Sequence, residues 1–220
     1  MNRKIKGVIF DLDGTLLNTL PDITGAVNSS LAEYKLEPRS EQEIAGFIFG
    51  GEKNLINMAM PDDIDDSLKE KVLHRFRFHY QARLTYETQE YRGVSRLLFA
   101  CARNGVRMAV LSNKPEKYTV PIISHYFPAL KFYSVQGSTG ELTKKPKPIK
   151  ALQIAAKMRL PPQSILFIGD TITDLKTARN AGMQECLVSW GFRSPQVLKT
   201  YYPRKMVFNS RQLENYILKQ

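Results

Sequence analysis

Short apolar segments recur along the chain and alternate with segments of helical periodicity. Bounded by Gly, Asp or Asn, the apolar segments are Lys6–Phe10, Val106–Leu111, Phe132–Val135, Ile165–Gly169, Glu185–Val188 and Met206–Phe208. Continuous apolar runs of this length are typical of strands covered on both faces, as in parallel sheets. Residues 93–104 and 148–158 place apolar side chains on one helix face, and residues 174–180 begin acidic and continue basic, as the helix dipole favours. The alternation predicts a three-layer α/β fold with a parallel sheet.

Residues 17–91 interrupt this alternation, because they show helical periodicity and no strand pattern. Four helices are expected there: one that begins near Pro21, one that a capping box at Ser40 begins, and two over Lys53–Met60 and Asp65–Tyr86. A helical insertion therefore follows the first strand, and the α/β pattern then resumes. We expect two domains, one formed by residues 1–16 and 92–220 and the other by residues 17–91.

Two pairs of aspartates follow apolar strands. Asp11 and Asp13 stand in the segment DLDGT directly after the first strand, and Asp170 and Asp174 follow the strand at 165–169. Carboxylates at i and i+2 of an extended chain project on the same side, and they repel each other unless a cation lies between them. A divalent cation such as Mg²⁺ prefers oxygen ligands, and ligands of open α/β sheets bind beyond the carboxyl ends of the strands. A solvated turn and a helix cap would explain each pair alone, but together the pairs favour one acidic site.

Polar residues that follow other segments extend this candidate site. Ser112 and Asn113 end the strand at 106–111 and present a hydroxyl and an amide at the same edge. Lys145 stands in the segment KKPKP, where the prolines keep it out of a regular helix, so its ammonium group is available to a phosphate. The neighbouring Lys144 and Lys147 are interpreted as solvated surface charge.

These four elements, in this order, resemble the haloacid-dehalogenase-like hydrolase superfamily. The motifs are DLDGT at Asp11–Thr15, SN at Ser112–Asn113, KPKP at Lys145–Pro148 and GDTITD at Gly169–Asp174. The resemblance covers nearly the whole chain, and it implies a Rossmann-like core with a small helical-bundle cap inserted after the first strand. Within the superfamily, the segments Asn18–Asp22, Tyr91–Val94 and Ser112–Pro115 are most similar to phosphoglycolate phosphatases.

The resemblance also implies roles for the acidic residues. Asp11 would be the nucleophile that attacks phosphorus and forms an aspartyl-phosphate, and Asp13 would be the general acid and then the general base. Mg²⁺ would be held by Asp11, by Asp170 and by the main-chain carbonyl of Asp13. Asp174 would be a further ligand or a partner of the ligands. The presence of Asp13 favours phosphoryl transfer over dehalogenation, because dehalogenases do not need this acid.

The remaining implied contacts concern the substrate. The residues expected to bind the phosphoryl group are Ser112, Asn113, Lys145 and Thr15. The cap would select the substrate by closing over the site. Its expected contact loop spans residues 49–53, where Gly51 would allow close approach and Lys53 would meet a substrate carboxylate; a flexible turn between two helices is the alternative.

The resulting hypothesis is a Mg²⁺-dependent phosphatase that hydrolyses a small phosphomonoester, in the manner of phosphoglycolate phosphatases. A β-phosphoglucomutase, a pyrophosphatase or a nucleotidase on the same fold is the alternative, because no position distinguishes phosphoglycolate from other small phosphate esters. From another class, a non-catalytic basic binding protein for nucleic acid is the remaining alternative.

The net charge changes this picture little. The chain has 32 Lys and Arg against 21 Asp and Glu, a formal charge of +11, and residues 141–220 hold 14 of the basic residues against 5 acidic ones. No basic stripe interleaved with aromatic residues accompanies this excess, so we expect a small phosphorylated metabolite as partner and no nucleic acid. No run approaches the roughly 18 apolar residues of a membrane span. We therefore expect a cytoplasmic monomer or homodimer without a membrane partner.

Overall fold

The chain folds into two compact units. The structure, a computed structural model, describes residues 4–48 and 50–219. One unit comprises Met1–Asn18 and Glu90–Gln220, and the other comprises Thr19–Gln89. Each end of the second unit lies two residues inside the insertion expected at 17–91, and the interpretation of this insertion as a cap domain stays a prediction.

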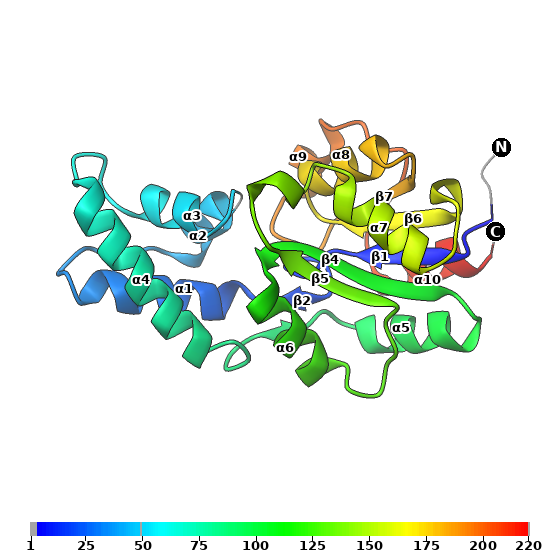
Figure 1. The fold of residues 1–220 in the computed structure, drawn as a ribbon, viewed down its shortest axis with the longest axis horizontal. Helices are drawn as coiled ribbons and strands as arrows, with labels where there is room; N and C mark the ends of the chain where they lie inside the picture. The colour runs from blue at the N-terminus through cyan, green and yellow to red at the C-terminus, as the bar shows by residue number, and fades with distance from the viewer. Residues whose placement is uncertain (1–3, 49, 220) are drawn as a thin grey trace. The chain divides into compact units, whose positions relative to one another are not determined.

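The larger unit is built on a six-stranded parallel sheet with the strand order β5-β4-β1-β6-β7-β8 (Figure 1). The strands are β1 (Gly7–Phe10), β4 (Arg107–Pro115), β5 (Ser134–Ser138), β6 (Ile165–Gly169), β7 (Gln184–Val188) and β8 (Met206–Val207). Each predicted apolar segment supplies one of these strands. The central strand β1 is fully buried, as expected for a strand paired on both sides and covered on both faces. The predicted parallel α/β fold is thereby confirmed.

Helices cover both faces of this sheet. They are α5 (Val94–Arg103), α6 (Glu116–Tyr126), α7 (Ile149–Lys157), α8 (Ile172–Asn180), α9 (Pro195–Lys199) and α10 (Ser210–Leu218), with two short 3₁₀ turns at Glu141–Thr143 and Pro162–Ser164. Alternate strand residues such as Ile9 and Phe167 pack with Ile154 of α7 and Ala178 of α8 in one apolar cluster. Helices α5 and α6 lie on the opposite side of the sheet (Figure 1).

The described part of the smaller unit contains four helices: α1 (Leu20–Ala32), α2 (Glu41–Phe47), α3 (Glu52–Ala59) and α4 (Asp66–Ala82). Helix α2 begins with the predicted capping box, in which the Ser40 hydroxyl accepts from the main-chain N–H of Glu43 and the Glu43 carboxylate accepts from that of Ser40. Within the described residues, no helix combines the length and the apolar composition needed to cross a bilayer.

The expectation that residues 17–91 hold no strand is wrong at their two ends. Strands β2 (Leu17–Asn18) and β3 (Gln89–Glu90) form a separate two-stranded sheet. Each is two residues long, which is too short to show the alternation of apolar and polar positions that marks a strand in a sequence.

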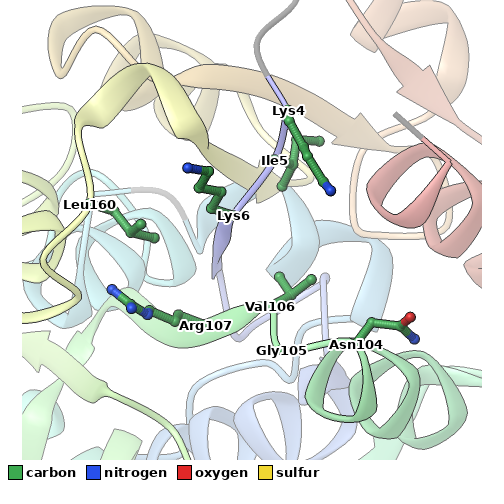
Figure 2. Close-up of a pocket in the computed structure, with 8 residues that line it drawn as sticks. All are labelled: Lys4, Ile5, Lys6, Asn104, Gly105, Val106, Arg107 and Leu160. Carbon is green, nitrogen blue, oxygen red and sulfur yellow. The ribbon is translucent and has the colours of Figure 1, made fainter.

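Because the strands are parallel, all their amino ends lie at one end of the large sheet and all their carboxyl ends at the other. These two ends differ in the residues that they present. At the amino ends of β1 and β4, a pocket of about 240 Å³ is lined by residues that include Lys4, Lys6 and Arg107 and no acidic side chain (Figure 2). None of the residues predicted for the active site lines this pocket. The predicted aspartates follow the carboxyl ends of β1 and β6, at the opposite edge.

Candidate active site

Three aspartates meet at the carboxyl edge of the sheet. The register that pairs Phe10 with Ile168 places Asp11 beside the end of β6, and the Asp11 N–H donates to the carbonyl of Ile168 at 2.8 Å. The carboxylates of Asp11, Asp170 and Asp174 each offer an oxygen within 4.8 Å of the others. All three residues are buried, with Asp170 fully so. The described residues therefore bring Asp11 of the first motif together with Asp170 and Asp174 of the second in one acidic site.

Two glycines allow the chain to surround Asp170. Gly14 has a φ of +77°, and a Cβ atom at this position would lie 2.2 Å from Oδ2 of Asp170. A Cβ atom at Gly191 would lie 2.4 Å from the same oxygen. The Oδ2 atom accepts a hydrogen bond from the main-chain N–H of Phe192 at 2.9 Å. The loop after β7 thus belongs to the site, although it was not predicted; the signal in the sequence was Gly191, three residues after the end of this apolar strand.

Lys145 connects two of the aspartates. Its Nζ atom lies 2.8 Å from Asp11 Oδ1 and 2.6 Å from Asp174 Oδ1, and its side chain is 3% exposed. Asn113 holds the main chain of Lys145 from both sides: its amide oxygen accepts from the Lys145 N–H at 2.8 Å, and its amide nitrogen donates to the Lys145 carbonyl at 3.1 Å. The structure therefore places Asn113 as a support of Lys145, and its contact with a phosphoryl group stays a prediction.

Asp174 belongs both to a helix start and to the acidic cluster. Its Oδ2 atom accepts from the Thr171 N–H at 3.1 Å and its N–H donates to the Thr171 hydroxyl at 3.4 Å, which together form the capping box of α8. The Thr171 hydroxyl also donates to Oδ2 at 2.6 Å. Its Oδ1 atom accepts from Lys145. The helix cap and the acidic site, which the sequence left as alternatives for this residue, are thus both present.

Asp13 contacts two residues near the carboxyl end of β4, Lys114 and Ser112. Its Oδ1 atom lies 2.5 Å from Nζ of Lys114, and its Oδ2 atom accepts from the Ser112 hydroxyl at 3.3 Å. The main-chain N–H of Lys114 donates to the Ser112 hydroxyl at 3.1 Å. Lys114 was not among the predicted site residues, although it directly follows the SN motif. The hydroxyl of Thr15 lies 3.5 Å from Oδ1 of Asp170.

The site carries an excess of negative charge in a buried place. Burial raises the pKa of Asp11 to about 7; Lys145 opposes this rise, and the carboxylates of Asp174 and Asp13 add to it. Burial and the same kind of repulsion, from Asp174 and Asp11, raise the pKa of Asp170 well above its usual value. Burial lowers the pKa of Lys145, but its two carboxylate neighbours outweigh burial and hold that pKa above its usual value. Four aspartates face two ammonium groups here, so the donor set suits a divalent cation with oxygen ligands.

The two residues predicted to contact substrate from the insertion belong to the smaller unit. Gly51 precedes α3 with a φ of +89°, and Lys53 forms an exposed ion pair with Glu70 at 2.8 Å. Phe49, the first residue of the predicted contact loop, lies outside the described residues. The contact of Gly51 and Lys53 with a substrate stays a prediction.

Comparison with known proteins places this site in a family. The phosphoglycolate phosphatase of Cereibacter sphaeroides is 36% identical over 194 residues, which cover 87% of this chain and 88% of that protein. The N-acetylmuramic acid 6-phosphate phosphatase of Pseudomonas aeruginosa is 28% identical over 193 residues, 88% of this chain and 85% of that protein. The crystal structure of a predicted phosphoglycolate phosphatase from Haemophilus somnus superimposes with a TM-score of 0.89 at 26% identity, covering 97% of this chain and 98% of that one.

The family itself follows from a match along most of the chain. The sequence model of the haloacid dehalogenase-like hydrolases matches residues 8–188, which include every motif quoted for the resemblance. The described aspartates and Lys145 lie within this range and occupy one edge of the sheet. The chain belongs to the haloacid dehalogenase-like hydrolase family.

Proposed function

We propose that this chain is a Mg²⁺-dependent phosphatase that hydrolyses a small phosphomonoester through an aspartyl-phosphate, with phosphoglycolate as the leading candidate substrate. The observation that carries the proposal is the arrangement of Asp11. Its Oδ1 atom is engaged by Lys145 and by the Leu12 N–H at 2.7 Å. Within the described residues its Oδ2 atom makes no hydrogen bond, so a lone pair is available to attack phosphorus.

The proposed reaction uses Asp11 and Asp13 in turn. Asp11 attacks phosphorus, and the bond from phosphorus to the leaving oxygen breaks while Asp13 gives that oxygen a proton. Asp13 then takes a proton from water as the water attacks the aspartyl-phosphate, which releases phosphate and restores both carboxyl groups. Lys145 offsets the charge of Asp11, which would otherwise repel an anionic phosphoryl group. Ser112 and Thr15 are the proposed hydrogen-bonding partners of the phosphoryl oxygens.

The proposed cation ligands are Asp11, Asp170 and the main-chain carbonyl of Asp13. Asp174 is assigned a supporting role, because Lys145 forms an ion pair with its Oδ1 atom at 2.6 Å and the hydroxyl and N–H of Thr171 both donate to its Oδ2 atom. When bound, Mg²⁺ neutralises charge on the phosphoryl group and acts as a Lewis acid toward it. The chain's own part is to hold the carboxylates in a dry, preorganised position.

The named relatives support the substrate class. Phosphatases that act on phosphoglycolate and on N-acetylmuramic acid 6-phosphate are both similar to this chain over most of its length. Both compounds are phosphomonoesters that carry a carboxylate, so the proposal extends to this class of small acids. A cytoplasmic location and a monomeric or homodimeric state are part of the proposal, and cell fractionation and light scattering test them.

A phosphate-release screen tests the proposed function. We expect Mg²⁺-dependent release from small carboxylate-bearing phosphomonoesters, loss of activity in EDTA, and recovery on addition of Mg²⁺. Asp11→Asn should be folded and inactive. Activity that persists in this variant, or in EDTA, contradicts the proposal, and isomerisation of a sugar phosphate without phosphate release would favour a mutase.

A further inference from the structure

Lys114 is a buried cation to which the proposed mechanism assigns no role. Its side chain is 6% exposed, and its Nζ atom lies 2.5 Å from Asp13 Oδ1, while the Asp13 side chain is 16% exposed. Holding an ammonium group out of water is unfavourable unless a charged partner and hydrogen bonds compensate. The close approach of Asp13 provides that compensation, so the position of each group depends on the other.

The main chain around Lys114 is itself held in place. Its N–H donates to the Ser112 hydroxyl, and its carbonyl accepts from the Thr119 hydroxyl at 3.2 Å. A Cβ atom at Gly137 would lie 2.6 Å from the same carbonyl, so β5 packs directly against this segment. The register between β4 and β5 shifts between Leu111 and Pro115, where Lys114 lies. These contacts fix the point from which the lysine reaches Asp13.

The two oxygens of Asp13 are thereby held at once. Lys114 engages Oδ1 and the Ser112 hydroxyl donates to Oδ2. Contacts at both oxygens of a carboxylate restrict its rotation as well as its position. Asp11 has a separate cation, Lys145, so the two aspartates of the DLDGT segment are paired with different lysines.

We infer that Lys114 is a positioning residue that aims the Asp13 carboxyl at the leaving oxygen of the substrate. The inference rests on the proposed function, in which Asp13 gives a proton to that oxygen as its bond to phosphorus breaks. Without Lys114 the carboxyl loses the short contact that holds its Oδ1 atom, while the Ser112 hydroxyl still donates to Oδ2, so the carboxyl turns out of the line of proton transfer. The loss falls on substrates whose leaving oxygen needs that proton, namely alkyl phosphates.

Lys114→Met tests this inference through its dependence on the leaving group. The variant removes the charge and keeps an unbranched apolar side chain. General acid catalysis contributes roughly 10²–10⁴-fold, so kcat/KM on the best alkyl phosphate should fall by about 100-fold. The kcat/KM on p-nitrophenyl phosphate should fall far less, because p-nitrophenolate leaves without a proton. This ratio is compared because it reports on the step in which the leaving group departs, whereas kcat also includes hydrolysis of the aspartyl-phosphate, in which Asp13 acts as the base for every substrate. A role confined to stabilising the fold would lower both rates by the same factor, and this result would overturn the inference.

The matched control is Lys117→Met. Lys117 is an exposed lysine three residues along the chain, with its ammonium group 4.7 Å from the ring of Tyr118. We expect it to leave both rates unchanged. If Lys114→Met does not fold by circular dichroism, Lys114→Arg takes its place, since it keeps the charge but cannot reproduce a single short contact to Oδ1.

A double variant shows whether Lys114 acts through Asp13. In an Asp13→Asn background the carboxyl group is already lost, so Lys114→Met should add little to the loss on alkyl phosphates. Additive losses would contradict the inference. Asp11→Asn, assayed beside these variants, distinguishes failure of the proposed function from failure of this inference. Activity in Asp11→Asn contradicts the proposed function, whereas equal losses on both substrates in Lys114→Met contradict only the role of Lys114.

Discussion

Gly14→Ala would place a methyl group against the carboxylate of Asp170. The added Cβ atom would lie 2.2 Å from Asp170 Oδ2, whereas ordinary contacts of a Cβ atom begin near 3.4 Å. The carboxylate would therefore have to move by about 1.2 Å. Asp170 is fully buried and its Oδ2 atom is held by the N–H of Phe192, so this movement also disturbs the loop after β7.

Two effects of different size follow from this substitution. The φ of +77° at Gly14 lies in the left-handed region, where a residue with a Cβ atom loses about 1–2 kcal/mol of stability. A displacement of about 1 Å at a catalytic group lowers turnover by roughly 100-fold. We therefore expect a modest fall in the free energy of unfolding and a large fall in kcat.

Gly105→Ala separates the two effects. Gly105 has a φ of +70°, and nothing lies within 4 Å of a Cβ atom at this position. Its variant should show a similar loss of stability in urea unfolding followed by circular dichroism, with normal phosphate release in Mg²⁺. If Gly14→Ala keeps normal turnover while its stability falls like that of Gly105→Ala, the close approach to Asp170 does not matter for activity and the reasoning is refuted.

Three further predictions follow from the described contacts. Asp22→Ala should lower the free energy of unfolding by about 3 kcal/mol in urea, because the buried carboxylate accepts from the N–H groups of Glu87 and Thr88; a loss below about 1 kcal/mol would contradict this. Thr171→Ala should lower stability by about 1 kcal/mol and also lower kcat, since the Thr171 hydroxyl holds Asp174. The control is Ser194→Ala, which removes the N-cap of α9 and should lower stability by a similar amount without changing kcat. If Thr171→Ala has the same kcat as Ser194→Ala, Thr171 does not support activity through Asp174. Mg²⁺ at about 100 times its dissociation constant should stabilise the protein by about 2.7 kcal/mol in thermal unfolding, and Asp170→Asn should abolish this shift. An unchanged shift would exclude Asp170 as a ligand.

The sheet could be predicted because its signal is local. Each strand carries its apolar run in consecutive residues, and burial on both faces of a parallel sheet requires this composition. The same argument failed for helix α6, which was not predicted. Pro121 stands inside this helix, and a buried polar residue, Thr119, interrupts its apolar face. In that helix the contacts with β4 and β5 outweigh the local preference.

The candidate site was predictable to the level of its acidic residues and Lys145. Like charges close together in the DLDGT segment, and an aspartate directly after a second buried strand, are visible without a structure. The sequence did not decide whether Asp174 caps a helix or belongs to the acidic site, and it did not show that Asn113 supports Lys145. The capping box of α8 and the contact of Asn113 with the main chain of Lys145 depend on where neighbouring loops lie.

The sequence by itself determined the six strands of the large sheet, the helices α5, α7 and α8 between them, the helical insertion and the residue types that meet at the carboxyl ends of the strands. Only the tertiary structure decided the further ion pairs, which join Lys145 to Asp174 and Lys114 to Asp13. Periodicity and spacing report on residues that are neighbours in the chain. Contacts across 29 residues, as between Lys145 and Asp174, or 101 residues, as between Lys114 and Asp13, depend on strand register and on the close approach that glycines such as Gly14 allow. No local pattern encodes either.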